Sequence, residues 1–304
     1  MTSVLTNLSS MAALRSLGNI GKQLEMTQKR ISSGLRVETG KDNAAYYALS
    51  ERMRGDSSAY ASISEGLTLS ANSVATARLG AESFLDLVDR FAERIAFAQN
   101  AEGGMAAIAG DLKGLVTEMT AVISASTFNG DDLVNAAGTL AATPTVSPLG
   151  VLTAGAEVTE TRRLVTGISR SGGSYGTTAI NFETVDLTRL QASFAAIADG
   201  FEANATATTG PTFLANILAE VDTLQSGAVD AATRLGVVEK SINSQQDFLA
   251  ALVDTLDTSV GAMVDADMEE EAARLQALQI QQQLATQALS IANAQPQGIL
   301  TLFE

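Results

Sequence analysis

Residues 4–35 read VLTNLSSMAALRSLGNIGKQLEMTQKRISSGL, and apolar side chains recur along this stretch at every third or fourth position. The mean step is about 3.4 residues, close to the 3.5 that keeps an apolar seam turned toward a partner helix in a coiled coil. One polar residue, Thr27, lies within the seam. We therefore predict one long helix, with a seam made of Val4, Leu8, Met11, Leu14, Leu17, Ile20, Leu24, Ile31 and Leu35.

The other end of the sequence repeats this pattern over residues 249–291, with a mean step of about 3.5 residues. The stripe consists of Leu249, Leu252, Leu256, Val260, Met263, Ala266, Glu270, Ala273, Ala277, Ile280, Leu284, Ala288 and Ile291. A second stripe beside it consists of Leu275, Leu278, Ala285, Leu289 and Ala292. Because the two stripes cover more than one face, a single partner helix cannot bury this helix completely.

The position of the two seams, at opposite ends of the sequence, favours an antiparallel pair of terminal helices whose remaining apolar width contacts neighbouring copies. The alternative is an ordinary intramolecular bundle, in which one chain covers every stripe by itself. The residues that we expect to pair helices or contact other subunits are Leu14, Leu17, Leu24, Ile31, Leu35, Ile280, Leu284, Leu289, Ile291 and Phe303.

The stretch between the seams also has mainly helical patterns. They cover residues 44–126, with a break at Glu102-Gly103-Gly104, and resume over 187–201 and 211–260. Residues 142–186 are instead rich in Pro, Gly, Thr, Val and Ser. This composition predicts a small β-rich or irregular central insert.

The predicted fold is therefore mainly α, a long antiparallel helical rod or coiled coil formed by the paired N- and C-terminal helices. We expect three domains. They are residues 1–42 with 264–304 as a terminal coiled coil, 43–141 with 187–263 as a helical rod, and 142–186 as an outward-facing insert.

Composition excludes several classes of function. The chain has 19 Lys and Arg against 34 Asp and Glu, and its net charge of −15 would repel nucleic acids and anionic membranes. Cys and His are absent from the sequence, which excludes the usual zinc sites and Ser-His or Cys-His catalysis. Residues 1–10 lack the features of a secretory signal peptide, so an exported chain would need another route.

Two stretches resemble binding sites only superficially. The acidic run from Asp265 to Glu271 lacks the spacing and the glycine of a calcium-binding loop. Negative charges near a helix start are stabilising without a metal, so we expect a solvated or inter-subunit acidic face. Residues 172–176 lack the Lys and Ser/Thr of a phosphate-binding loop. We therefore predict no catalytic, metal-binding or cofactor-binding residues.

Four motifs, in order along the chain, resemble the signatures of bacterial flagellins. The first contains Arg30, Ser33, Gly34, Leu35 and Arg36, and is followed by Asp42 and Asn43, either of which can cap a helix at Ala44. The second is Phe128-Asn129-Gly130. The third contains Asp265, Asp267, Glu269 and Glu270, and the fourth spans residues 281–293.

This resemblance implies a secreted, non-enzymatic subunit that polymerises into the extracellular flagellar filament for swimming motility. It also implies a flagellar export chaperone, the type III export apparatus, and hook-associated and cap proteins as partners. A hook-filament junction protein, which has similar helical ends, is the alternative. Residues 89–100 keep Arg90 and Arg94 but depart from the Arg-x-Arg-Glu-Leu order that an innate immune receptor recognises in many flagellins.

Overall fold

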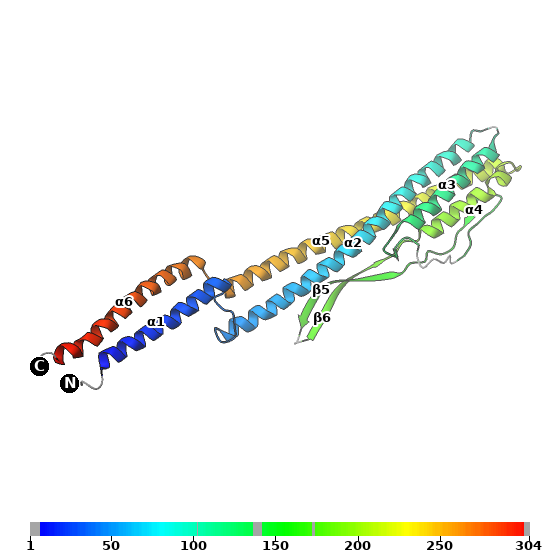
Figure 1. Ribbon diagram of the computed structural model, residues 1–304. Coiled ribbons are helices and arrows are strands. Elements are labelled where there is room, and N and C mark those ends of the chain that lie inside the picture. The colour runs from blue at the N-terminus through cyan, green and yellow to red at the C-terminus, as the bar shows by residue number, and fades with distance from the viewer. Residues whose placement is uncertain (1–6, 102, 136–141, 172–173, 301–304) are drawn as a thin grey trace. The chain divides into compact units, whose positions relative to one another are not determined.

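The computed structural model describes residues 7–101, 103–135, 142–171 and 174–300 (Figure 1). The predicted contact residues Val4 and Phe303 lie outside these described residues. The helices are α1 (Leu8–Ser33), α2 (Ala44–Ala98), α3 (Met105–Ala125), α4 (Leu187–Ala205), α5 (Gly210–Val264) and α6 (Met268–Leu300). The mainly helical fold with a small strand-containing central region is thus confirmed.

The described strands form three two-stranded antiparallel sheets. The first two are short and pair β1 (Thr127–Phe128) with β2 (Asp131–Asp132), and β3 (Thr145–Val146) with β4 (Leu152–Thr153). The third pairs β5 (Thr161–Ser171) with β6 (Ser174–Glu183), and its register shifts between Val165 and Gly167.

Two compact units divide the chain. Unit 1 is the described part of Met1–Ser58 and Val253–Glu304, and unit 2 is the described part of Ala59–Leu252. Both divisions fall inside the 55-residue helices α2 and α5, whereas the sequence suggested divisions near residues 42 and 263. Unit 2 also contains residues 142–186, so the compact units do not set this insert apart from the helical rod.

Unit 2 is built around a continuous hydrophobic core to which α2, α3, α4 and α5 all contribute. The Phe194 ring packs edge-to-face against Phe91 and Phe84, with ring centroids 4.9 and 6.3 Å apart. Phe201 and Phe213 form a similar pair at 6.1 Å. All five rings are fully buried, so the few aromatic residues of this core are gathered in two edge-to-face clusters.

The β5–β6 hairpin is hydrogen-bonded to the helices of unit 2 through both of its strands. The Tyr60 hydroxyl, from α2, donates to the carbonyl of Ile168 at 2.9 Å, and Gln245 Nε2, from α5, donates to the carbonyl of Thr166 at 3.0 Å. These two bonds reach β5, and Arg234 Nη2 of α5 donates to Glu183 Oε2 of β6 at 3.2 Å.

Unit 1 contains α1, α6, the beginning of α2 and the end of α5. A hydrogen bond from the Ser57 hydroxyl to Asp257 Oδ1, at 2.9 Å, joins α2 to α5 within this unit. No helix over the described residues is long and apolar enough to cross a membrane.

Candidate functional site

The ends of α1 are defined by its capping residues. The Asn7 side chain accepts a hydrogen bond from the backbone N–H of Ser10 at 3.1 Å, as expected of an N-cap. At the other end Gly34 has a left-handed φ of 72°, and its N–H donates to the Arg30 carbonyl at 2.8 Å. A glycine adopts this conformation without steric cost, which explains why the helix stops here.

Helices α1 and α6 lie side by side and antiparallel (Figure 1). At one end Asn7 Nδ2 donates to the Ala292 carbonyl at 2.8 Å, and the Ser10 hydroxyl donates to Asn293 Oδ1 at 2.7 Å. At the other end Arg30 Nη1 donates to Glu271 Oε1 at 2.9 Å. These contacts define one register along the pair.

The α1 side of the contact follows the predicted seam only in part. Thr27 is buried, and the half-buried residues on the same seam are Leu17, Ile20, Leu24 and Ile31. Leu8, Met11 and Leu14 are exposed instead, and Leu14 exposes 61% of its surface. Over the first turns of α1, the predicted seam is therefore not the face that α6 covers.

The α6 side uses the second stripe rather than the first. The buried or half-buried residues are Glu271, Leu275, Leu278, Gln282, Ala285, Leu289 and Ala292, which step by four and three in strict alternation. Ile280, Leu284 and Ile291 of the first stripe are 58%, 58% and 68% exposed. The sequence could not separate the stripes, because both have the same helical period and both contain many alanines.

A short segment after α1 pairs with the chain just before α6. Leu35 and Asp265 form an isolated antiparallel β-bridge, and Ala266 N–H donates to the Gly34 carbonyl at 2.9 Å. The Arg36 N–H donates to the Val264 carbonyl at 2.7 Å. Signature residues that are far apart in the sequence thus meet through their backbones, and Leu35 contributes to this bridge rather than to the α1 helix.

This backbone pairing covers a second, small hydrophobic core. Val37, Val260 and Val264 are buried in it, with Leu35, Met53 and Met263 packed against them. The long apolar pattern that the sequence shows over residues 249–291 is therefore broken between α5 and α6, and its first part belongs to this core and to unit 2.

Asp42 and Asn43 have different roles at the start of α2. Asp42 Oδ2 accepts hydrogen bonds from the backbone N–H groups of Thr39 and Glu38, and from the Thr39 hydroxyl, at 2.9, 3.2 and 3.0 Å. The bond from the Thr39 backbone is the main cause of a lowered pKa of the Asp42 carboxyl. Asn43 Oδ1 accepts from Ala45 and Tyr46 and so caps the helix.

The acidic motif starts α6. Asp267 Oδ1 accepts hydrogen bonds from the backbone N–H groups of Glu269 and Glu270 at 3.0 and 3.1 Å, so it serves as the helix cap. Glu269 and Glu270 are exposed in the first turn, where negative charge is favourable. Among the described residues, no group of three or more Asp or Glu is arranged to hold a metal ion.

Glu271, next in the same run, is the functional residue that the sequence analysis missed. Its side chain is only 6% exposed, and Oε1 accepts from Arg30 of α1 and from Arg274 of α6 at 2.9 and 3.3 Å. A signal for this burial was present, because Glu271 is four residues before Leu275 and seven before Leu278. It therefore occupies a position of the seam that faces α1.

The Phe128-Asn129-Gly130 motif belongs to unit 2, where it forms the tight turn between β1 and β2. Asn129 and Gly130 have positive φ values of 51° and 81°, which the turn of a two-residue hairpin requires. Asp131 then accepts a hydrogen bond from the Ser73 hydroxyl at 2.8 Å, which ties the hairpin to α2.

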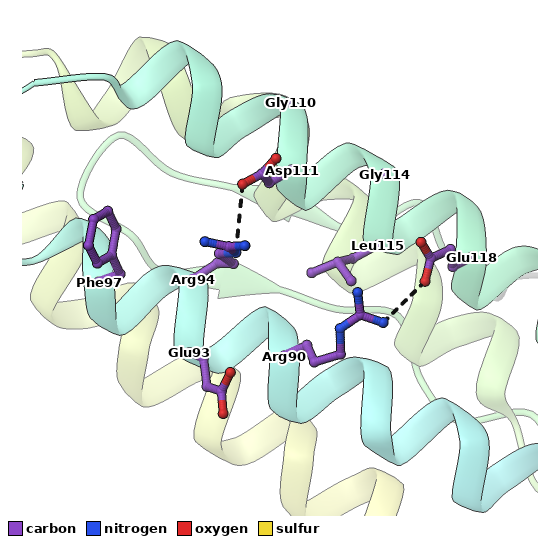
Figure 2. Close-up of a pocket in the computed structure, with 9 residues that line it drawn as sticks. All are labelled: Arg90, Glu93, Arg94, Phe97, Gly110, Asp111, Gly114, Leu115 and Glu118. Carbon is purple, nitrogen blue, oxygen red and sulfur yellow. Dashed lines mark hydrogen bonds and ion pairs between the residues drawn. The ribbon is translucent and has the colours of Figure 1, made fainter.

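An open groove of about 560 Å³ lies between α2 and α3, and its charged residues pair with one another (Figure 2). Arg90 contacts Glu118 at 3.4 Å and Arg94 contacts Asp111 at 3.6 Å. All four side chains are more than half exposed, so these pairs contribute little to stability. Arg90 and Arg94, the two arginines that residues 89–100 keep, thus contact acidic residues of α3.

Comparison with known proteins matches both ends of the chain. Residues 4–139 match the family model described as bacterial flagellin N-terminal helical region, and residues 218–303 match the bacterial flagellin C-terminal helical region. A flagellin of Brucella melitensis biotype 1 is 33% identical over 305 residues, which cover 100% of this chain and 99% of that protein.

Flagellin C of Rhizobium meliloti strain 1021 is 33% identical over 339 residues, and flagellin A of Rhizobium meliloti is 31% identical over 395 residues. Both alignments cover the whole of this chain and the whole of the relative. The chain therefore belongs to the bacterial flagellin family and is a structural subunit of the extracellular flagellar filament.

Proposed function

We propose that this flagellin polymerises through the apolar side chains that its terminal helix pair leaves uncovered. These side chains, which we call the open stripes, are Leu8, Met11, Leu14 and Met26 of α1 and Ile280, Leu284 and Ile291 of α6. Their exposure in a chain whose α1 and α6 are already paired is the observation that carries the proposal. Each such side chain contributes about 1.5–3 kcal/mol if a neighbouring copy buries it fully.

The residues of the seam have a different role in this proposal. Leu17, Leu24, Ile31 and Leu289 hold α1 against α6 within one chain, and Leu35 helps to join the two ends of the pair. The open stripes of one copy then meet a different surface of the next copy. Such a contact does not close on itself, so it generates a helical polymer.

The same open stripes support the partners that the sequence suggested. An apolar surface of this kind invites premature association. We therefore propose that a flagellar export chaperone covers α6 until the chain passes through the type III export apparatus. Hook-associated and cap proteins would contact the two ends of the finished polymer. This role is structural, and it includes no catalytic step, cofactor, membrane or nucleic acid.

We further propose that the domains predicted from sequence describe positions in the filament. Residues 1–42 with 264–304 would form the inner layer, 43–141 with 187–263 the rod around it, and 142–186 the outer surface. The two family models leave residues 140–217 unmatched, and some relatives align over 395 residues against the 304 of this chain. Added length is best tolerated on a surface, which supports an outward position for this part.

A seeded elongation assay tests the open stripes. Filament fragments would be mixed with monomer carrying Ile280→Asn and Leu284→Asn, and growth would be followed by sedimentation and electron microscopy. Because the polar side chains remove apolar burial between copies, we expect elongation to fall at least about tenfold. The matched control carries Ile280→Leu and Leu284→Met, keeps the apolar surface, and should elongate at nearly the normal rate.

Both variants must retain the helix content of the unsubstituted monomer, as measured by circular dichroism. Normal elongation by the asparagine variant would show that the open stripes of α6 do not join the copies. Electron micrographs also separate the two candidate assemblies, because a filament subunit gives long polymers and a hook-filament junction protein gives only short rings. The full-length flagellin relatives favour the filament.

A further inference from the structure

Two carboxylates are buried among the described residues, Asp186 and Glu271, and they differ in how they are satisfied. Asp186 accepts backbone hydrogen bonds on both oxygens, from Arg189 at 2.9 Å and from Val158 at 3.1 Å. In Glu271 both donors reach Oε1, and the buried Oε2 has no hydrogen-bond partner among the described atoms. A buried carboxylate with an unpaired oxygen contributes little to the stability of the fold, because burial of a charge is costly unless all its polar atoms are paired.

The apolar residues of the α1–α6 seam cannot by themselves choose a register. Their steps of three and four repeat every seven residues on both helices, so a slide of seven positions again places apolar side chains opposite one another. The backbone bonds around Gly34 and Leu35 act only at one end of the pair, at residues 264–266 where α5 passes into α6. A slide of seven residues would place Gly34 opposite helical residues whose N–H groups are already bonded, so these bonds would be lost. Along the helices themselves, the choice of register is left to the side chains.

Glu271 distinguishes one register from the others because its cross-helix partner is Arg30. After a slide of seven residues in one direction Arg30 would face Leu278, and in the other direction it would face Val264, both of which are buried apolar residues. Glu271 would keep Arg274 of its own helix, but the neutral residues Val37 or Gln23 would take the place of Arg30 opposite it. Each alternative thus leaves a buried carboxylate without the cationic partner that α1 supplies in the native register, which is destabilising.

We propose that Glu271 is the register-determining residue of the terminal helix pair. A buried polar residue in a mainly apolar seam is a well-attested way to select one alignment of two helices at some cost in stability. The inference concerns pairing within one chain, so it does not depend on the contacts that we propose between copies.

Disulfide crosslinking can read the register directly, because the natural sequence contains no cysteine. The pair Ser10→Cys with Asn293→Cys reports the native register, since these side chains are hydrogen-bonded at 2.7 Å. Ser10→Cys with Thr286→Cys and Leu17→Cys with Asn293→Cys report slides of seven residues in the two directions. In the native register each of these pairs is offset by about 10.5 Å along the helix, beyond disulfide reach.

The full-length chain would be oxidised both as monomer and after elongation from seeds, and the crosslinks would be separated by electrophoresis. Intramolecular crosslinks alter the mobility of the single chain, whereas crosslinks between copies give dimers. With Glu271 present we expect the native crosslink to exceed each shifted one by about tenfold or more. With Glu271→Leu we expect the helix content to persist and the ratio to fall by about tenfold or more.

Glu270→Leu is the matched control, because it makes the same substitution at an exposed position one residue away. It should leave the crosslink ratio unchanged. Glu271→Gln keeps the size and polarity of the side chain and should give a ratio between those of the other two chains. The ratio counts only molecules that have paired, so partial unfolding lowers the yield without altering the ratio.

Two results would overturn the proposal. One is an unchanged crosslink ratio in both Glu271 variants, which would mean that the seam or the backbone bridge selects the register. The other is the absence of the native crosslink with Glu271 present, in the monomer and in the polymer alike. Crosslinking is read within one chain, so neither result depends on whether the variant elongates seeds.

Discussion

The two units of this flagellin bury their side chains to very different degrees. Unit 2 has a complete core in which five phenylalanine rings are fully buried, whereas α1 buries only Thr27 among its described residues. Unit 1 instead exposes Leu8, Ile291 and the other open stripes. One chain thus contains a unit with a large closed core and a second unit whose terminal helices bury few of their apolar side chains.

Removal of residues 273–304 should produce the largest difference between the units. Without most of α6, α1 loses its partner, and isolated helices gain little stability from local propensity alone. We expect a soluble, partly helical monomer that fails to elongate seeds but retains the thermal unfolding transition of unit 2. Circular dichroism and sedimentation measure the two properties. Long filaments from the truncated chain would show that assembly does not need α6. Loss of the unfolding transition of unit 2 would show that unit 2 does not fold independently of α6.

Phe194→Ala tests the core of unit 2. Phe194 is fully buried and contacts the Phe84 and Phe91 rings, so its truncation should lower the free energy of unfolding by about 3–5 kcal/mol. Chemical denaturation monitored by circular dichroism measures this change. The control, Phe248→Ala, removes a ring that is 59% exposed and should change stability far less. Equal losses in the two variants would show that this core does not dominate the folding of unit 2.

Two glycines of α2 test how tightly unit 2 is packed. A Cβ atom on Gly80 would lie 1.8 Å from the Ser126 hydroxyl, so Gly80→Ala should destabilise the chain by about 1–3 kcal/mol. Gly66 has no atom within 4 Å of the same position, and Gly66→Ala should stabilise the helix by about 0.5–1 kcal/mol. The midpoints of denaturant unfolding should therefore move in opposite directions. Shifts of the same sign would mean that Ser126 can move aside, so that the close approach at Gly80 does not destabilise the alanine variant.

Asp42 should produce the smallest effect, confined to unit 1. Its pKa is lowered in the folded chain, so its contribution to stability is complete above the ordinary aspartate pKa and is lost as the pH falls through the lowered value. Carboxyl resonances followed by NMR during acid titration should place Asp42 below its ordinary pKa. Asp42→Asn should remove this pH dependence without affecting unit 2. A titration at the ordinary pKa would show that the turn at residues 38–42 is not formed in the monomer.

Much of the helical fold could be predicted from sequence, because periodic apolar positions and glycines act locally. Leu17, Leu24 and Ile31 follow the spacing of a paired helix, and the break near Gly103 and Gly104 separates α2 from α3 as expected. The division between the units could not be predicted in this way. It falls within two continuous helices, where no local chemical signal marks a change of tertiary partner.

The candidate site was predictable only in part, since its details depend on which residues face one another. The interruption between α5 and α6 contains neither Pro nor Gly. Asp267 instead marks it, because its side chain caps the start of α6. The spacing of Glu271 to Leu275 and Leu278 indicates its burial, but its pairing with Arg30, 241 residues earlier, is a contact that no local pattern reveals. Sequence spacing therefore identified apolar stripes but not which stripe would be covered.

The pairing of α1 with α6 brings together two segments that are translated far apart in time. A molecule whose synthesis or translocation stopped before α6 cannot complete the pair, however well its unit 2 has folded. If growth of the polymer requires that pair, the growing end rejects incomplete molecules without a separate inspection step. Under that condition, the long sequence separation between the two helices would restrict the polymer to molecules that contain both.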